Sequence, residues 1–238
     1  MAEIQRRIYR DHGPAILFEN VKDCQFQCIS NIYGTTKRAK LLFKKTYKAV
    51  RSIISAKGDP VGLLKHPFGA MQALVTAGYG LPLKVPNSVA PVMQCRAKLE
   101  DLPQIVSWPM DGGAYITLPQ VYSEHPDHIG NPFKSNLGMY RIQMSGNEYI
   151  KNKEIGLHYQ IHRGIGVHQK LYNDRKKPFK VAIFIGGSPS MAFSAVMPLP
   201  EGMPEVAFSG LMAGRNFRYT TYQGWTIAAD ADFAIIGT

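Results

Sequence analysis

Two apolar alternations and one helical pattern occupy the first quarter of the chain. Residues 14–21 predict a buried strand and residues 26–32 a second strand, with a turn at residues 22–23 between them. Residues 37–56 carry apolar side chains at helical spacing, which predicts one amphipathic helix. A short helix is expected over residues 63–77, and Pro82, Pro86 and Pro91 then mark an extended connector.

The rest of the chain is dominated by short apolar segments that end at turn residues. The predicted strands cover residues 92–96, 105–108, 115–119, 138–144, 156–161, 180–185, 217–222 and 231–236. The turn 109–113 is expected because adjacent glycines allow positive φ. Ser188 and Pro189 predict the start of a helix through Val196, and a second helix is expected from Pro204 to Gly214.

This order of elements predicts an α+β fold in two parts. Strands at such spacing favour an antiparallel barrel or sandwich in the main domain, residues 86–238. The proline-rich connector places a boundary near residue 85, so residues 1–85 are expected to form a small N-terminal α/β lobe.

Composition narrows the class of protein. Hydrophobic residues make up 45% and charged residues 19% of 238 residues, which is typical of a globular chain. No apolar run reaches the roughly 18 residues of a membrane helix, and the first residues lack the apolar core of a signal peptide. The three cysteines, Cys24, Cys28 and Cys95, fit a reducing cytoplasm, where we expect the protein to reside.

The net charge of +11 is concentrated in one stretch. Eight cations and no acid occur between residues 37 and 57. Because apolar residues recur there at helical spacing, the cations are expected on the solvated face of the helix, with an anion-binding or partner surface as the alternative. No helix-turn-helix, zinc-finger or aromatic RNA-binding signature is present, so we expect no nucleic-acid partner.

Residues 136–168 concentrate the candidate chemistry. If residues 136–142 form one strand, Asn136, Gly138, Tyr140 and Ile142 share one face. In the next strand His158, Gln160 and His162 would alternate on one face, which also suits a polar edge facing water. Arg163 and Gly164 supply a cation and a close backbone approach suited to phosphate.

Asn136, a histidine and Glu205 together offer the oxygen and nitrogen ligands of a Mn²⁺ or Mg²⁺ site. Glu205 alone is otherwise a favourable partner for a helix dipole. The turn 186–189 matches neither a dinucleotide fingerprint nor a Walker loop, and no serine lies in a nucleophile elbow.

Several separated blocks resemble the UbiD family of reversible decarboxylases, which is named for 3-polyprenyl-4-hydroxybenzoate decarboxylase. The blocks are GPAILFENV at 13–21, LPQIVSW at 102–108, GGAYIT at 112–117, NLGMYR at 136–141, HRG at 162–164 and PEVAFSG at 204–210. Their order and spacing extend over nearly the whole chain.

The resemblance implies a split-barrel domain of the flavin-binding type that binds prenylated FMN with Mn²⁺, and usually K⁺, at the cofactor phosphate. The implied function is non-oxidative decarboxylation of an aromatic or α,β-unsaturated acid through a covalent flavin adduct. The implied metal ligands are Asn136, His162 and Glu205. The implied cofactor-binding residues are Asn136, Met139, Tyr140, Arg141, His158, Tyr159, Gln160, Arg163, Gly164 and Glu205. The implied catalytic residues are Arg141, which holds the departing carboxylate, and Asp232.

The resemblance also implies partners and shows departures. We expect a carboxylic acid substrate, a flavin prenyltransferase that supplies the cofactor, and a homo-oligomer or separate C-terminal subunit. Family members carry E-x-x-x-E-G where Asp232 keeps the first carboxylate and Ile236 replaces the second glutamate. The family's C-terminal oligomerisation domain is absent from these 238 residues, so we expect a chain shortened relative to a longer parent. The alternative function is a non-catalytic or partner-dependent flavin-binding fragment.

Overall fold

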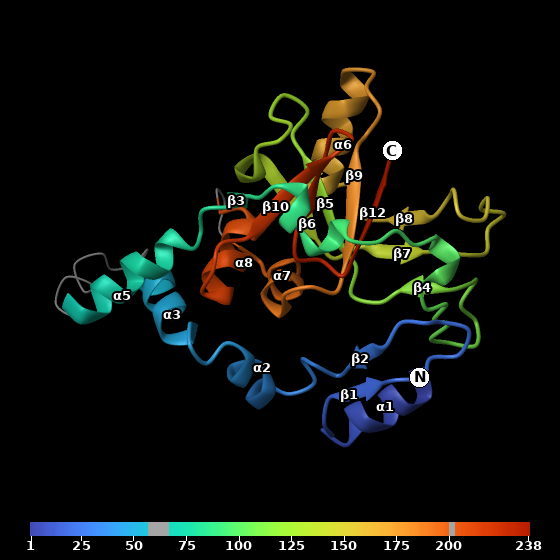
Figure 1. The fold of residues 1–238 in the computed structure, drawn as a ribbon, viewed down its shortest axis with the longest axis horizontal. Coiled ribbons are helices and arrows are strands. Elements are labelled where there is room, and N and C mark those ends of the chain that lie inside the picture. Colours follow the sequence, from blue (N-terminus) through green and yellow to red (C-terminus); the bar gives the residue numbers. More distant parts are fainter. Residues whose placement is uncertain (57–66, 200–202) are drawn as a thin grey trace. The chain divides into compact units, whose positions relative to one another are not determined.

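The computed structural model describes residues 1–56, 67–199 and 203–238 (Figure 1). Within these residues the chain forms two compact units. Unit 1 comprises residues 1–42, 95–117 and 140–158, and unit 2 comprises residues 43–94, 118–139 and 159–238. Helices and several sheets confirm the predicted α+β class. The described strands form no closed barrel, and the boundary expected near residue 85 stays a prediction.

Unit 1 contains short helices and two small sheets. Its helices are α1 (Ala2–Arg10) and α2 (Thr36–Leu42). Its strands are β1 (Ile16–Phe18), β2 (Cys28–Ser30), β4 (Tyr115–Ile116), β7 (Arg141–Gln143) and β8 (Gly156–His158). Strands β1 and β2 pair antiparallel, whereas β7 lies between β4 and β8 in a three-stranded antiparallel sheet. Leu17 at the centre of β1 is exposed, so the prediction of a buried first strand is wrong.

Unit 2 holds the larger core. Its helices are α3 (Tyr47–Ala56), α5 (Pro67–Gly78), α6 (Gly164–Asp174), α7 (Pro189–Ser194) and α8 (Glu205–Ala213). Its strands are β3 (Leu83–Lys84), β5 (Gln120–Glu124), β6 (Ser135–Gly138), β9 (Val181–Ile185), β10 (Arg218–Tyr222), β11 (Trp225–Ala228) and β12 (Phe233–Gly237). One sheet has the antiparallel order β12-β9-β5-β6, and the other has the order β11-β10-β3.

The core of unit 2 fixes α7 and α8, which lie side by side (Figure 1). Leu137, Phe184, Met191 and Val206 are at most 2% exposed and belong to one apolar cluster that joins β6, β9, α7 and α8. Burying large apolar side chains in this way stabilises a fold by about 1.5–3 kcal/mol each. Strand β6 is therefore held rigidly against α8, which begins at Glu205.

Helix α8 is also anchored by contacts with residues 43, 46 and 79. The Thr46 hydroxyl donates to the carbonyl of Met212 at 2.7 Å, and Phe43 belongs to the same apolar cluster as Phe208 and Met212. A Cβ at Gly210 would lie 2.0 Å from the carbonyl oxygen of Tyr79, so the two backbones meet at a glycine. Thr46 and Phe43 lie in a turn, which divides the predicted helix 37–56 into α2 and α3.

Some local predictions are confirmed and others are wrong. The strand 180–185, the turn 109–113 and the helices after Ser188 and Pro204 are observed as expected. Residues 92–96 and 105–108 form no strand, because residues 91–93 make a 3-10 turn and Asp111 accepts from the amides of Ser107 and Trp108. The first part of the predicted helix 63–77 lies outside the described residues, and α5 occupies the remainder.

Candidate functional site

The strand predicted over residues 138–144 is not continuous. Strand β6 ends at Gly138, β7 begins at Arg141, and the two belong to different sheets. The Met139 amide donates to the Ala195 carbonyl at 3.1 Å, so the chain leaves β6 bound to the end of α7. The prediction that Asn136, Gly138, Tyr140 and Ile142 share one strand face is therefore wrong.

In unit 2, Glu205 lies against the peptide that joins Asn136 to Leu137. Its Oε2 accepts a hydrogen bond from the Leu137 amide at 3.1 Å. Burial raises the pKa of the Glu205 carboxyl, while the backbone amides of Glu205 and Leu137 act in the opposite direction. In the part of the chain that the structure describes, no cation forms a salt bridge with Glu205. A partly buried carboxylate held by neutral amides suits a metal ion as its counter-charge.

Asn136 lies beside the first residue of α6. A Cβ at Gly164 would be 2.1 Å from the Asn136 side-chain oxygen, so the Asn136 side chain lies directly against the start of α6. Gly164 and Glu205 thus both lie against β6, the first at the Asn136 side chain and the second at the Leu137 amide. The helix α6 itself was missed by the sequence prediction, and its two early glycines explain why.

The predicted alternation of His158, Gln160 and His162 is wrong. Strand β8 ends at His158, and the next residues form a turn in which the Arg163 amide donates to the Gln160 carbonyl at 3.0 Å. The Arg163 Nε also donates to the Gln160 side chain at 3.4 Å. This turn precedes the N-terminus of α6 and leaves His162 exposed to solvent.

Tyr159 precedes this turn, and burial raises the pKa of its hydroxyl. Over residues 1–56, 67–199 and 203–238, no group of three or more histidine, cysteine, aspartate or glutamate side chains is arranged to hold a metal ion. The ligand set Asn136, His162 and Glu205, which includes an asparagine, stays a prediction.

Asp232 precedes β12 and is held by the backbone of the turn after β9. Its Oδ2 accepts from the Gly187 amide at 3.2 Å, and its own amide donates to the Ile185 carbonyl at 3.1 Å. Gly186 and Gly187 have φ of +69° and +80°, a conformation that glycine adopts without strain. The buried Gln120 donates to the Gly186 carbonyl at 3.2 Å, a support that sequence analysis missed because β5 was not predicted.

In unit 1, Arg141 lies on a polar face of the sheet β4-β7-β8. It is paired directly with His158 on the neighbouring strand. Its guanidinium carbon is 4.3 Å from the centre of the Tyr115 ring, a cation–π contact that orients the side chain. Asp111 is 3.9 Å away, too far for a hydrogen bond. With the side chain 57% exposed, the guanidinium can donate to a ligand.

Another feature of the stretch 136–168 is the histidine that ends it. The His168 Nδ1 is 2.9 Å from the Ser123 hydroxyl on β5. Burial lowers the pKa of His168 from 6.5 to about 4, and the nearby His125 acts in the same direction. His168 therefore remains neutral near pH 7 and contributes to packing between α6 and β5.

These observations describe an α+β protein with a partly buried glutamate bound to the strand that carries Asn136, and an exposed arginine on a separate sheet. Residues 84–238 match the family of the 3-octaprenyl-4-hydroxybenzoate carboxy-lyase Rift-related domain, and residues 1–57 match the N-terminal domain of the same carboxy-lyase. The chain belongs to the UbiD family, which confirms the resemblance noted in the sequence.

Curated relatives agree with this assignment. The chain is 34% identical over 245 residues to a protein of Chlamydia pneumoniae that is named as one subunit of a 4-hydroxybenzoate decarboxylase. It is 30% identical over 242 residues to an uncharacterised protein of Aquifex aeolicus. These matches cover 100% and 94% of the chain but only 40% and 46% of the relatives. The chain thus spans less than half the length of these relatives.

Solved structures share the fold. The vanillic acid decarboxylase of Sedimentibacter hydroxybenzoicus in its closed form superposes with a TM-score of 0.78 at 21% identity, over 99% of this chain and 48% of that chain. The UbiD-class enzyme HmfF of Pelotomaculum thermopropionicum, in complex with FMN, gives a TM-score of 0.73 at 18% identity over the same shares. Among the described residues, no helix is both long and apolar enough to cross a membrane.

Proposed function

We propose that this chain is the prenylated-FMN-binding part of a UbiD-type decarboxylase for an aromatic or α,β-unsaturated carboxylic acid. The observation that carries the proposal is the partly buried Glu205 carboxylate bound to the Leu137 amide, on the strand where Asn136 meets Gly164. Family membership and the complex of HmfF with FMN support a flavin as the ligand. We also propose that residues 86–238 form the split barrel of the family and residues 1–85 its N-terminal lobe.

Within unit 2 we assign Asn136, Glu205 and His162 to a Mn²⁺ ion at the cofactor phosphate, with K⁺ nearby. Glu205 and Asn136 fit a hard cation because both present oxygen atoms close to one peptide. His162 lies in the turn that precedes α6. We assign Met139, Tyr159, Gln160, Arg163 and Gly164 to flavin binding, with the exposed Arg163 in the turn as the cation for the phosphate.

Within unit 1 we assign Arg141 to the substrate carboxylate, and Tyr140 and His158 to the cofactor. The exposed guanidinium above Tyr115 retains donors for a bidentate carboxylate contact. When bound, prenylated FMN would supply the electron sink for the charge left as CO₂ departs. Asp232, whose orientation is set by the Gly187 amide, would deliver or accept the proton.

The test is reconstitution of the full chain with prenylated FMN and Mn²⁺, followed by measurement of CO₂ release and of substrate hydrogen–deuterium exchange. Turnover of an aromatic or unsaturated acid would support a decarboxylase. Flavin binding without turnover would leave the cofactor assignment intact and favour the second function below. A chain that retains no flavin would contradict both.

A second function, a partner-dependent flavin-binding fragment, is favoured by Ile236. This residue stands where the family has its second glutamate, and in β12 it packs against the apolar core of unit 2. Further support comes from the vanillic acid decarboxylase ShVdcCD, one structure of which is described with a truncated ShVdcD, and from the naming of the Chlamydia pneumoniae relative as one subunit of an enzyme. Co-purification with an added subunit that restores turnover would distinguish this function from the first.

A further inference from the structure

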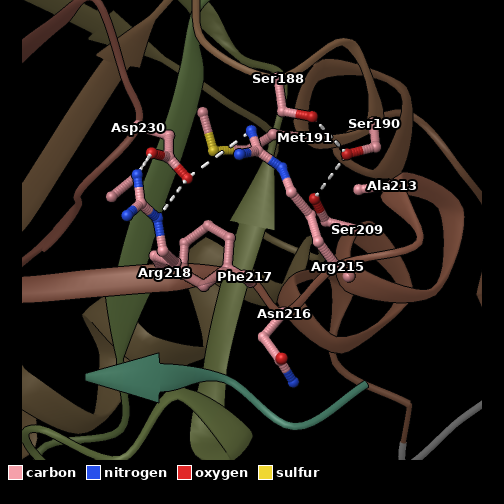
Figure 2. Close-up of a pocket in the computed structure, with 12 residues that line it drawn as sticks. Ser188, Ser190, Met191, Ser209, Ala213, Arg215, Asn216, Phe217, Arg218 and Asp230 are labelled. Atoms are coloured by element: carbon pink, nitrogen blue, oxygen red, sulfur yellow. Dashed lines mark hydrogen bonds and ion pairs between the residues drawn. The ribbon is translucent and has the colours of Figure 1, made fainter. Parts of the chain in front are cut away.

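Unit 2 contains a pocket that none of the assignments above uses. It lies between the start of α7, the second half of α8 and the strands β10 and β11 (Figure 2). Its enclosed part is small, about 20 Å³, which is room for about one water molecule, and the rest is open to solvent. A ligand must therefore be small and lie mostly in the open part.

The positive charge of one arginine in the pocket is not fully neutralised by a carboxylate. Arg218 makes a bidentate ion pair with Asp230, with Nε to Oδ2 at 3.1 Å. Arg215 approaches the same carboxylate only to 3.7 Å, which is too long for a hydrogen bond, and its side chain is 56% exposed. Because one carboxylate faces two guanidiniums, the pocket has an excess positive charge at Arg215 (Figure 2).

A chain of serine hydroxyls faces the same space. Ser188 Oγ is 2.7 Å from Ser190 Oγ, which is 3.2 Å from Ser209 Oγ on α8. Three hydroxyls have three protons, and two of these are used within the chain. Ser190 and Ser209 are buried, so their protons need partners within the protein. When Ser209 donates to Ser190 and Ser190 donates to Ser188, both buried protons are used. The Ser188 proton then remains to donate to a ligand.

We propose that this pocket binds a small oxyanion, a phosphate or a small carboxylate, through the Arg215 guanidinium and the Ser188 hydroxyl. The buried side chains of Met191 and Phe217 form the apolar wall beside these donors. Charge-assisted hydrogen bonds from a guanidinium are the stronger kind, and the hydroxyl adds direction. Ser209 on the pocket wall lies four residues after Glu205, about one turn along α8, and all residues of the pocket belong to unit 2.

The proposal is tested by amide chemical-shift titration of the full, cofactor-free chain with inorganic phosphate and, separately, with acetate. Saturable shifts at Ser188, Arg215 and Phe217 are expected with at least one probe. The probe that binds more tightly identifies the source of the oxyanion. Because no flavin is present, the result is independent of the proposed decarboxylase function.

Three variants make the test specific. Arg215→Gln is expected to weaken binding of the preferred probe at least tenfold, and Ser188→Ala several-fold. Arg51→Gln removes the same charge from an exposed position on α3, away from the pocket, and is expected to change the affinity less than twofold. Absence of saturable shifts with both probes would overturn the proposal, as would equal weakening in Arg51→Gln and Arg215→Gln.

Discussion

The Glu205 site in unit 2 and the Arg141 face in unit 1 are built in opposite ways. Glu205 is partly buried, bound to a backbone amide, and carried by a helix with three anchors. Arg141 is mostly exposed and is oriented by one ring and a distant carboxylate. The first arrangement is rigid before any ligand arrives, whereas the second gains its final geometry from the ligand. Loss of Glu205 should therefore affect mainly cofactor binding, and loss of Arg141 mainly turnover.

The largest effect is expected from Arg141→Ala in the reconstituted full chain. Loss of the group that holds the carboxylate should lower the decarboxylation rate by roughly 10²–10³-fold or more, with flavin still bound. Rates of CO₂ release and flavin absorbance measure the two effects separately. Arg10→Ala, an exposed arginine of α1, is the control and should retain the rate. Full activity of Arg141→Ala would contradict the catalytic assignment.

Glu205→Gln tests the role proposed for the Glu205 site in unit 2. The amide keeps an oxygen that can accept from Leu137, so the fold should survive while the negative charge is lost. The affinities of the chain for Mn²⁺ and for flavin should then both fall at least about tenfold. Metal content and flavin absorbance after gel filtration report the change. If the variant held as much flavin as the parent chain, with and without Mn²⁺, the proposed link between metal and cofactor would be wrong.

The rigidity attributed to α8 is tested by Gly210→Ala. The added methyl group would lie 2.0 Å from the Tyr79 carbonyl, and neither backbone can move freely. We expect a loss of roughly 2–3 kcal/mol in the free energy of unfolding, measured by urea denaturation. Gly78→Ala meets no atom within 4 Å and serves as the control, which should be neutral or stabilising. Equal stabilities of the two variants would refute the close contact.

A smaller effect is expected at His168 on acidification. Its pKa in the folded chain is lowered to about 4, so the unfolded chain binds more protons between pH 6.5 and 4. Stability should be complete above pH 6.5 and decline as the pH falls, by roughly 1–2 kcal/mol at pH 5. His168→Gln should flatten this dependence in urea titrations, whereas His12→Gln, at an exposed position, should not. An unchanged slope in His168→Gln would assign the acid sensitivity to other groups.

Local signals in the sequence were sufficient for the elements that start and stop sharply. The apolar run before Gly186 predicted β9, and Pro204 with Gly214 predicted α8, which ends at Gly214 in the left-handed conformation. The helix over 37–56 was predicted as continuous because its periodicity cannot show that Thr46 bonds to the distant Met212. In that case tertiary contacts overrode local pattern.

Only part of the candidate site was predicted, again because tertiary contacts leave no local pattern in the sequence. Asn136, Gly164 and Glu205 were singled out from their chemistry and from the resemblance, and in the structure Gly164 and Glu205 both lie against β6. Gln120 and Ala195 act through contacts with the distant Gly186 and Met139, and no residue pattern announces such contacts. The excess charge at Arg215 was equally hidden, because it depends on how Asp230 is shared.

The central claim is that the Glu205 site holds a flavin through a metal ion. The most direct measurement is the visible absorbance of the full chain after co-expression with a flavin prenyltransferase and desalting in the presence or absence of Mn²⁺. A flavin band that persists with Mn²⁺, weakens without it and is lost in Glu205→Gln is the predicted result. A chain that shows no flavin band even with Mn²⁺, or retains it equally in Glu205→Gln, would contradict the claim.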